Sequence, residues 1–139
     1  TAKRLGVELP LLGGDGWDAP DLFKIGGEAV EGCYYSNHFA LDVASDKAKA
    51  FIAAFEKANG TKPTGLGALG YDAAHVLIEA IKRAGKTDGE SLKAAIAATK
   101  DYEGVTGKIT INDKRDADKS AVVLKIEGGA AKFEATVAP

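Results

Sequence analysis

The sequence predicts an α/β fold whose sheet is incomplete, and three observations lead to this prediction. In the first half of the chain, short apolar segments typical of strands alternate with segments typical of helices. The middle of the chain is strongly amphipathic, and the last third alternates apolar and polar residues as β-strands do. Because both faces of a parallel sheet must be covered by helices, the few strands of the front half need more sheet than this chain provides.

The first predicted elements are two short strands with a helix between them. Residues 9–12 (LPLL) predict a buried strand. Asp18 is expected to cap the helix that follows, which ends at Gly26. Residues 29–39 predict the second strand, and Cys33 within it is expected to be a small buried apolar residue.

The middle of the chain predicts three helices. Ser45 is expected to cap the first, which ends at Gly60, and Gly85 ends the second. Thr87 and Glu90 form a capping-box pattern that opens the third. The apolar stripe of the second helix consists of Leu69, Ala73, Leu77, Ile78 and Ile81.

The end of the chain predicts further strands. Residues 107–111 alternate as a strand, 112–119 form a charged turn, and 121–137 predict a hairpin across Gly128-Gly129. The side chains expected on one side of its second strand are Phe133, Ala135 and Val137.

Composition excludes several classes of function. The net charge of −2 and the lack of a basic face argue against nucleic-acid binding, and the apolar runs are too short for membrane insertion. A single cysteine excludes an intramolecular disulfide and a cysteine-cluster metal site. The chain has no signal-peptide pattern, no methionine, and begins at Thr1, so we expect it to be a piece of a longer protein.

Asp15 is the main candidate for binding chemistry. It follows the end of a predicted strand, where open α/β sheets bind ligands, and its carboxylate could hold a ligand ammonium group. Trp17 beside it could offer an apolar wall or a cation–π face. The alternative is an Asp-Gly turn with Trp17 packed on the next helix. The glycine spacing matches neither a dinucleotide nor a phosphate-loop motif, so no such cofactor is expected.

The remaining candidates do not form a catalytic set. His38 ends a strand and could lie near a cleft, whereas His75 lies within a helix. The two histidines are too far apart for a helix-spaced metal pair, and no nucleophile-elbow sequence is present. We therefore expect neither an enzyme nor a metal site.

The chain resembles the C-terminal part of bacterial periplasmic binding proteins for branched-chain amino acids, which serve ABC transporters. The resemblance runs from Thr1 to Pro139 and depends on the order and spacing of several segments. These are LGGDGWDAPDL, GEAVEGCYYSNHF, ALGYDAAHVLIEAIKRAG, LKAAIAATKDYEGVTGKITI and AVVLKIEGG.

This resemblance implies part of a two-lobed type I periplasmic-binding fold, with flavodoxin-like three-layer lobes, that is incomplete without its N-terminal half. Residues 1–38 would belong to the C-terminal lobe, 39–118 to the N-terminal lobe, and 119–139 to the return crossing and the C-terminal lobe. The missing half would be a partner within the same protein or in a second chain.

The resemblance also implies a site. Asp15 matches the acidic residue that holds the α-ammonium group of the ligand, and Trp17 would wall the cleft. The residues matching the apolar side of the pocket are Leu66, Gly67 and Ala68. An aromatic residue common near this position is absent, and the groups that hold the ligand carboxylate would lie in the missing half.

The implied function is capture of a small amino acid by hinge closure and delivery to an ABC transporter permease. The implied location is the periplasm, or the outer face of a Gram-positive cell with a lipid anchor. Three alternatives stay open: a sensor domain of the same fold, an enzyme on a flavodoxin-like scaffold, and a fragment that completes its sheet by swapping or dimerisation.

Overall fold

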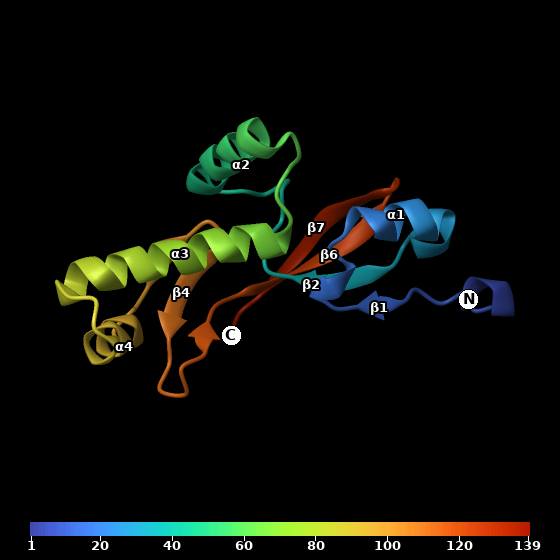
Figure 1. Ribbon diagram of the computed structural model, residues 1–139. Helices are drawn as coiled ribbons and strands as arrows, with labels where there is room; N and C mark the ends of the chain where they lie inside the picture. The colour runs from blue at the N-terminus through green and yellow to red at the C-terminus, as the bar shows by residue number, and fades with distance from the viewer.

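The computed structural model describes residues 1–139 and divides the strands between two sheets (Figure 1). The first sheet contains, in spatial order, β1 (Leu12–Gly13), β2 (Tyr34–Asn37), β6 (Ala121–Glu127) and β7 (Ala130–Val137). The second contains β3 (Tyr102–Gly104), β4 (Gly107–Ile111) and β5 (Ala117–Asp118). The helices are α1 (Pro20–Gly26), α2 (Asp46–Asn59), α3 (Gly65–Ala84) and α4 (Gly89–Ala97). This mixed architecture confirms the predicted α/β class.

The two sheets lie at opposite ends of an elongated molecule. In Figure 1, α1 lies beside the first sheet, and α2, α3 and α4 gather around the second. β1 and β2 are parallel, while β6 and β7 add to β2 in antiparallel order. The chain passes between the two ends after β2 and again before β6.

Three strand predictions need correction. The expected buried strand at 9–12 is wrong, because the ladder begins only at Leu12 and the side chain of Leu9 is 72% exposed. Pro10 has no N–H to donate to a ladder, which explains the late start. The predicted charged turn at 112–119 contains β5, and β3 was not predicted.

The predicted helix ends agree with the structure better than the predicted strands do. The Ser45 side chain accepts the Ala48 N–H, and Gly60 and Gly85 end α2 and α3 in the left-handed conformation, as predicted. The predicted capping box of α4 is wrong, since Asp88 rather than the preceding threonine accepts a first-turn N–H. Aspartate is a strong N-cap residue, and it lies one position nearer the helix.

The first core lies between α1 and the first sheet. Its most buried members are Cys33, Tyr35 and Ile126, so the prediction for Cys33 is confirmed. The Leu11 N–H points at the Cys33 sulfur at 3.3 Å. The β6–β7 hairpin forms as predicted, but a register shift interrupts its alternation: of the expected side chains, Phe133 packs on this core and Val137 is exposed.

Trp17 packs against the same core. Its ring lies 6.4 Å from that of Tyr35, centroid to centroid. A Cβ added at Gly13 would lie 2.2 Å from the ring, so only glycine allows the ring to rest on the end of β1.

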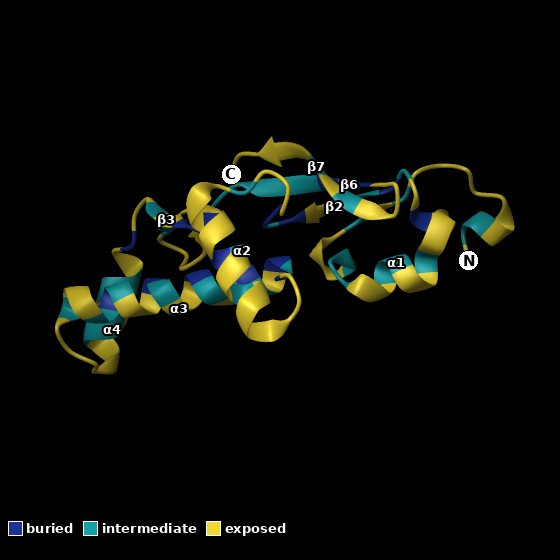
Figure 2. Ribbon diagram, turned by 90° about the horizontal axis from the view of Figure 1, so that it is seen from above, coloured by how far each residue is buried: buried dark blue, intermediate teal, exposed yellow.

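The second core joins α2 and α3. Phe51 of α2 packs on Tyr71 of α3 with ring centroids 4.6 Å apart, and Ala68 is fully buried beneath them. The buried positions of α3, dark blue in Figure 2, are mostly occupied by small residues. The predicted apolar stripe lies beside this buried face, and Leu77 and Ile78 in it are 42% and 44% exposed.

Asp72 is the one buried carboxylate of the chain, at 1% exposure. It accepts three hydrogen bonds from the β3–β4 turn: from the Val105 and Thr106 N–H groups and the Thr106 hydroxyl, at 2.7–2.8 Å. A Cβ at Gly104 would lie 2.5 Å from its oxygen. Asp72 therefore fixes the second sheet to α3.

Replacing Asp72 with alanine is expected to lower the free energy of unfolding by about 2–4 kcal/mol, because buried N–H groups lose their acceptor. Urea unfolding followed by circular dichroism measures this. Asp88→Ala removes an exposed helix cap and is the control, with an expected loss of about 1 kcal/mol. An equal or smaller loss for Asp72→Ala would contradict the assignment.

Gly13→Ala is expected to displace the ring of Trp17, the only tryptophan, and to shift its fluorescence emission to longer wavelength as water reaches the ring. Gly14→Ala is the matched control, because a Cβ there meets nothing within 4 Å. The same spectrum for both variants would show that the ring does not rest on Gly13.

Candidate functional site

The candidate site begins where the parallel strands β1 and β2 end. Asp15 opens a short 3-10 helix, η2 (Asp15–Trp17), directly after β1, and His38 directly follows β2. Because parallel strands end at the same sheet edge, the two side chains meet: His38 Nε2 lies 3.4 Å from Asp15 Oδ2. Both stay accessible, with 35% and 53% of their side-chain surface exposed.

The histidine gives the carboxylate a fixed neighbour. The other imidazole nitrogen, Nδ1 of His38, is buried without a hydrogen-bond partner. Nε2 is therefore the ring nitrogen that faces a polar partner, the carboxylate of Asp15. Sequence reasoning weighed His38 near a cleft but did not pair it with Asp15.

The first turn of α3 holds the other predicted site residues. Leu66 is 64% exposed, and Ala68 is fully buried in the second core. Gly67 lies between them, and its Cα faces the Phe55 ring. Trp17, by contrast, is half-buried against its own sheet.

Asp18 connects the two regions. The prediction that it caps α1 is wrong: the N-cap position is Ala19, and no side chain caps that helix. Asp18 Oδ2 instead accepts the Gly65 N–H at 2.5 Å, across 47 positions of sequence. This hydrogen bond brings the η2 loop next to Leu66, so the structure places the two predicted parts of the site together.

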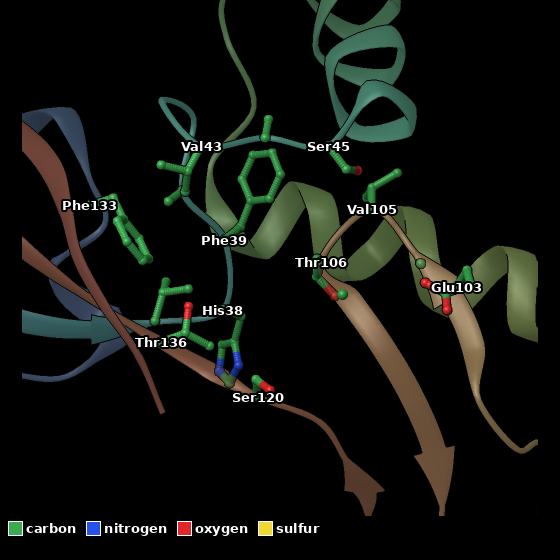
Figure 3. Close-up of a pocket in the computed structure, with 15 residues that line it drawn as sticks. His38, Phe39, Val43, Ser45, Glu103, Val105, Thr106, Ser120, Phe133 and Thr136 are labelled. Carbon is green, nitrogen blue, oxygen red and sulfur yellow. The ribbon is translucent and has the colours of Figure 1, made fainter. Parts of the chain in front are cut away.

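A cavity of about 450 Å³ lies beside His38 (Figure 3). His38, Phe39, Thr106 and Ser120 line it, together with residues of β7. None of the five predicted site residues lines this cavity. Its volume falls in the range of small-molecule sites.

Lys119 ties together the two segments that pass between the sheets. Its Nζ donates to the Ser120 carbonyl at 3.0 Å and approaches the His38 carbonyl at 3.4 Å. Burial lowers the pKa of this ammonium group below its usual value, while the charge of Asp72 opposes that change.

No helix has both the length and the apolar character needed to cross a membrane. No three His, Cys, Asp or Glu side chains come together as metal ligands would.

Several known proteins are similar to this chain in sequence and in fold. The Leu/Ile/Val-binding protein homolog 1 of Brucella abortus is 29% identical over 126 residues, which is 90% of this chain and 33% of that protein. The leucine-binding protein of Thermotoga maritima has a crystal structure that matches with a TM-score of 0.92 and 43% identity, over 99% of this chain and 40% of that one.

A second structure was solved with a ligand. The branched-chain amino acid transporter substrate-binding protein of Streptococcus pneumoniae, in complex with isoleucine, matches with a TM-score of 0.84 and 31% identity, over 99% of this chain and 40% of that one. The chain thus spans about a third of the curated relative and two fifths of these structures. The family model described as periplasmic binding protein matches residues 1–131, and the chain belongs to that family.

Proposed function

We propose that this chain is part of the substrate-binding component of an ABC importer and helps to hold a small amino acid with an aliphatic side chain. The observation that supports the proposal is the Asp18–Gly65 hydrogen bond, which joins the loop of the accessible Asp15 to the first turn of α3, where the exposed Leu66 lies. An amino acid with an apolar side chain needs both groups. The isoleucine complex of the Streptococcus relative supports the same ligand class.

Each residue of the site then has one role. Asp15 accepts the ligand ammonium group, and the attraction strengthens when closure removes water. His38 holds the carboxylate in place at 3.4 Å. Leu66 contacts the aliphatic side chain, Gly67 lies beside it, and Ala68, buried in the second core, fixes this turn of α3 from behind. Trp17 lines one side of the ligand cleft at the edge of the first sheet.

The same proposal divides the chain into two lobes and a hinge. Residues 1–38 and 119–139 form one lobe with the return crossing, and 39–118 belong to the other. Sheet membership supports this division, because β1, β2, β6 and β7 share one sheet and β3, β4 and β5 the other. Closure of the lobes on the ligand is the binding step.

The rest of the site and of the second lobe would come from another segment, either of the same protein or of a second chain. An apolar groove of about 390 Å³ supports this, because it leaves side chains such as Leu77, Ile96 and Ile111 uncovered. A sheet packed there would bury them, and the same segment would supply donors for the ligand carboxylate.

Location and partners follow from this role. The protein would work outside the cytoplasmic membrane, in the periplasm or on a lipid anchor, and would pass its ligand to a membrane permease. The matched relatives are described as binding proteins, which supports capture rather than catalysis.

Asp15→Ala in the intact protein is expected to weaken binding of L-leucine at least about tenfold, because a charged hydrogen bond to the ammonium group is lost. Isothermal titration calorimetry measures this.

The matched control is Asp21→Ala. Asp21 lies on α1 and its side chain is 75% exposed beside Lys24, so its loss is expected to leave binding unchanged. Equal affinities for the Asp15 variant and the wild type would contradict the proposed site.

A further inference from the structure

The Asp15 carboxylate has one ion-pairing partner in this chain, and that partner is a histidine. His38 Nε2 lies 3.4 Å from Asp15 Oδ2, whereas no lysine or arginine pairs with this carboxylate. The nearby Asp18 carboxylate is already engaged by the Gly65 N–H. Because histidine is the side chain that ordinarily changes its charge between about pH 5 and 8, Asp15 faces a neighbour that can become a cation.

The charged form of the His38 ring would depend on Asp15. An imidazolium carries an N–H on both ring nitrogens. Nδ1 of His38 is buried without a hydrogen-bond partner, so the Asp15 carboxylate is the polar group that faces the ring. Without this carboxylate, a protonated ring would hold a positive charge with no acceptor for either N–H. Loss of Asp15 to another cation therefore favours release of the ring proton.

The other charged groups around His38 do not replace Asp15. Lys119 Nζ lies 3.4 Å from the His38 carbonyl oxygen, and its positive charge disfavours an imidazolium. Glu103 of β3 lines the same cavity as His38 (Figure 3) and favours the imidazolium, but Lys108 Nζ lies 3.5 Å from the Glu103 carboxylate. The residues that β6 and β7 contribute to this cavity carry no charge.

A ligand ammonium group would meet the same carboxylate. Asp15 contributes one negative charge, which a neutral His38 leaves for a cation of the ligand. When His38 is protonated, the pair has no net charge, and an added ammonium group leaves one positive charge uncompensated. Water weakens this repulsion, because 35% and 53% of the two side chains are exposed. The imidazolium and the ammonium group are thus two cations for one carboxylate.

We propose that His38 is an internal competitor for the ammonium group of the ligand: the protonated ring occupies the Asp15 carboxylate, so amino acid binding weakens as the pH falls. This inference rests on the proposed function, in which Asp15 holds that ammonium group. Binding in turn drives the ring proton to the solvent, because the effect of one cation on the other is reciprocal. His38 therefore sets the pH range in which the site captures an amino acid.

Calorimetry on the intact protein at two pH values tests the competition. L-Leucine is a zwitterion at both, so a change in affinity comes from the protein. The wild type is expected to bind about two- to fivefold more weakly at about pH 5.5 than at about pH 7.5. His38→Gln, whose amide stays neutral, is expected to lose this difference. His75→Gln, which replaces the other histidine of the chain, is the matched control and is expected to keep it.

Proton release is a readout that a purely structural role of His38 would not change. Titration of L-leucine at about pH 6 in two buffers with different ionisation enthalpies measures the protons released for each ligand bound. The wild type and His75→Gln are expected to release a fraction of a proton, and His38→Gln is expected to release none. Circular dichroism establishes that each variant is folded.

The ligand-free protein gives an independent measurement. NMR follows the imidazole signals against pH, and the signal that is missing in His38→Gln identifies the ring. In Asp15→Asn, the titration of this signal is expected to move to lower pH, because the amide has no charge to stabilise the imidazolium. Asp21→Asn changes an exposed carboxylate on α1 and is the control.

The outcomes distinguish the two proposals. A His38 titration that moves in Asp15→Asn supports pairing of the imidazolium with Asp15 even if no amino acid binds, in which case only the proposed function fails. An unchanged titration, or equal proton release by the wild type and His38→Gln, would overturn the competition even if L-leucine binds as expected.

Discussion

One hydrogen bond, from the Gly65 N–H to the Asp18 carboxylate, determines how the two parts of the candidate site face each other. Asp15 lies three residues before the acceptor and Leu66 one residue after the donor, so neither can move far from the other while this bond persists. The rest of the site follows from the sheet, because parallel pairing of β1 and β2 brings His38 to Asp15. A carboxylate and an imidazole thereby meet at one sheet edge, and the first turn of α3 is joined to the same loop.

Each end of the molecule is stabilised by its own set of contacts. The first sheet packs on α1 through Cys33, Tyr35 and Ile126, which belong to a mainly apolar core. At the other end, small buried residues of α3 let this helix approach its neighbours closely. Asp72 then holds the second sheet to α3, because its buried carboxylate accepts three hydrogen bonds from the β3–β4 turn. Since each end is internally fixed, the clamp motion that we propose would occur in the segments that connect the two ends.

Local patterns in the sequence predicted much of this fold. Ser45, Gly60 and Gly85 marked helix ends because capping depends on a few neighbouring residues, and the α/β class followed from periodicity. Asp18 was misassigned to α1 because its true partner lies 47 residues away, and no local rule indicates a long-range acceptor. The burial of Asp72 was missed for the same reason, whereas β3 and β5 pair with their neighbour β4 but are only three and two residues long. Within the site, Asp15 was a candidate from its place after a predicted strand, Leu66 came from the family resemblance, and the His38–Asp15 pair required the sheet register.

The most direct test of the central claim, that Asp15 holds the ligand ammonium group, is a thermodynamic cycle on the intact protein. Calorimetry would compare L-leucine with 4-methylpentanoate, which lacks the amino group, for the wild type and for Asp15→Asn. If the Asp15 carboxylate contacts the ammonium group, the wild type binds L-leucine much more tightly than 4-methylpentanoate, whereas Asp15→Asn distinguishes the two ligands little. The ratio of these two affinity differences is then expected to exceed about tenfold. Independent, additive losses would show that Asp15 and the ammonium group do not interact, and would contradict the account.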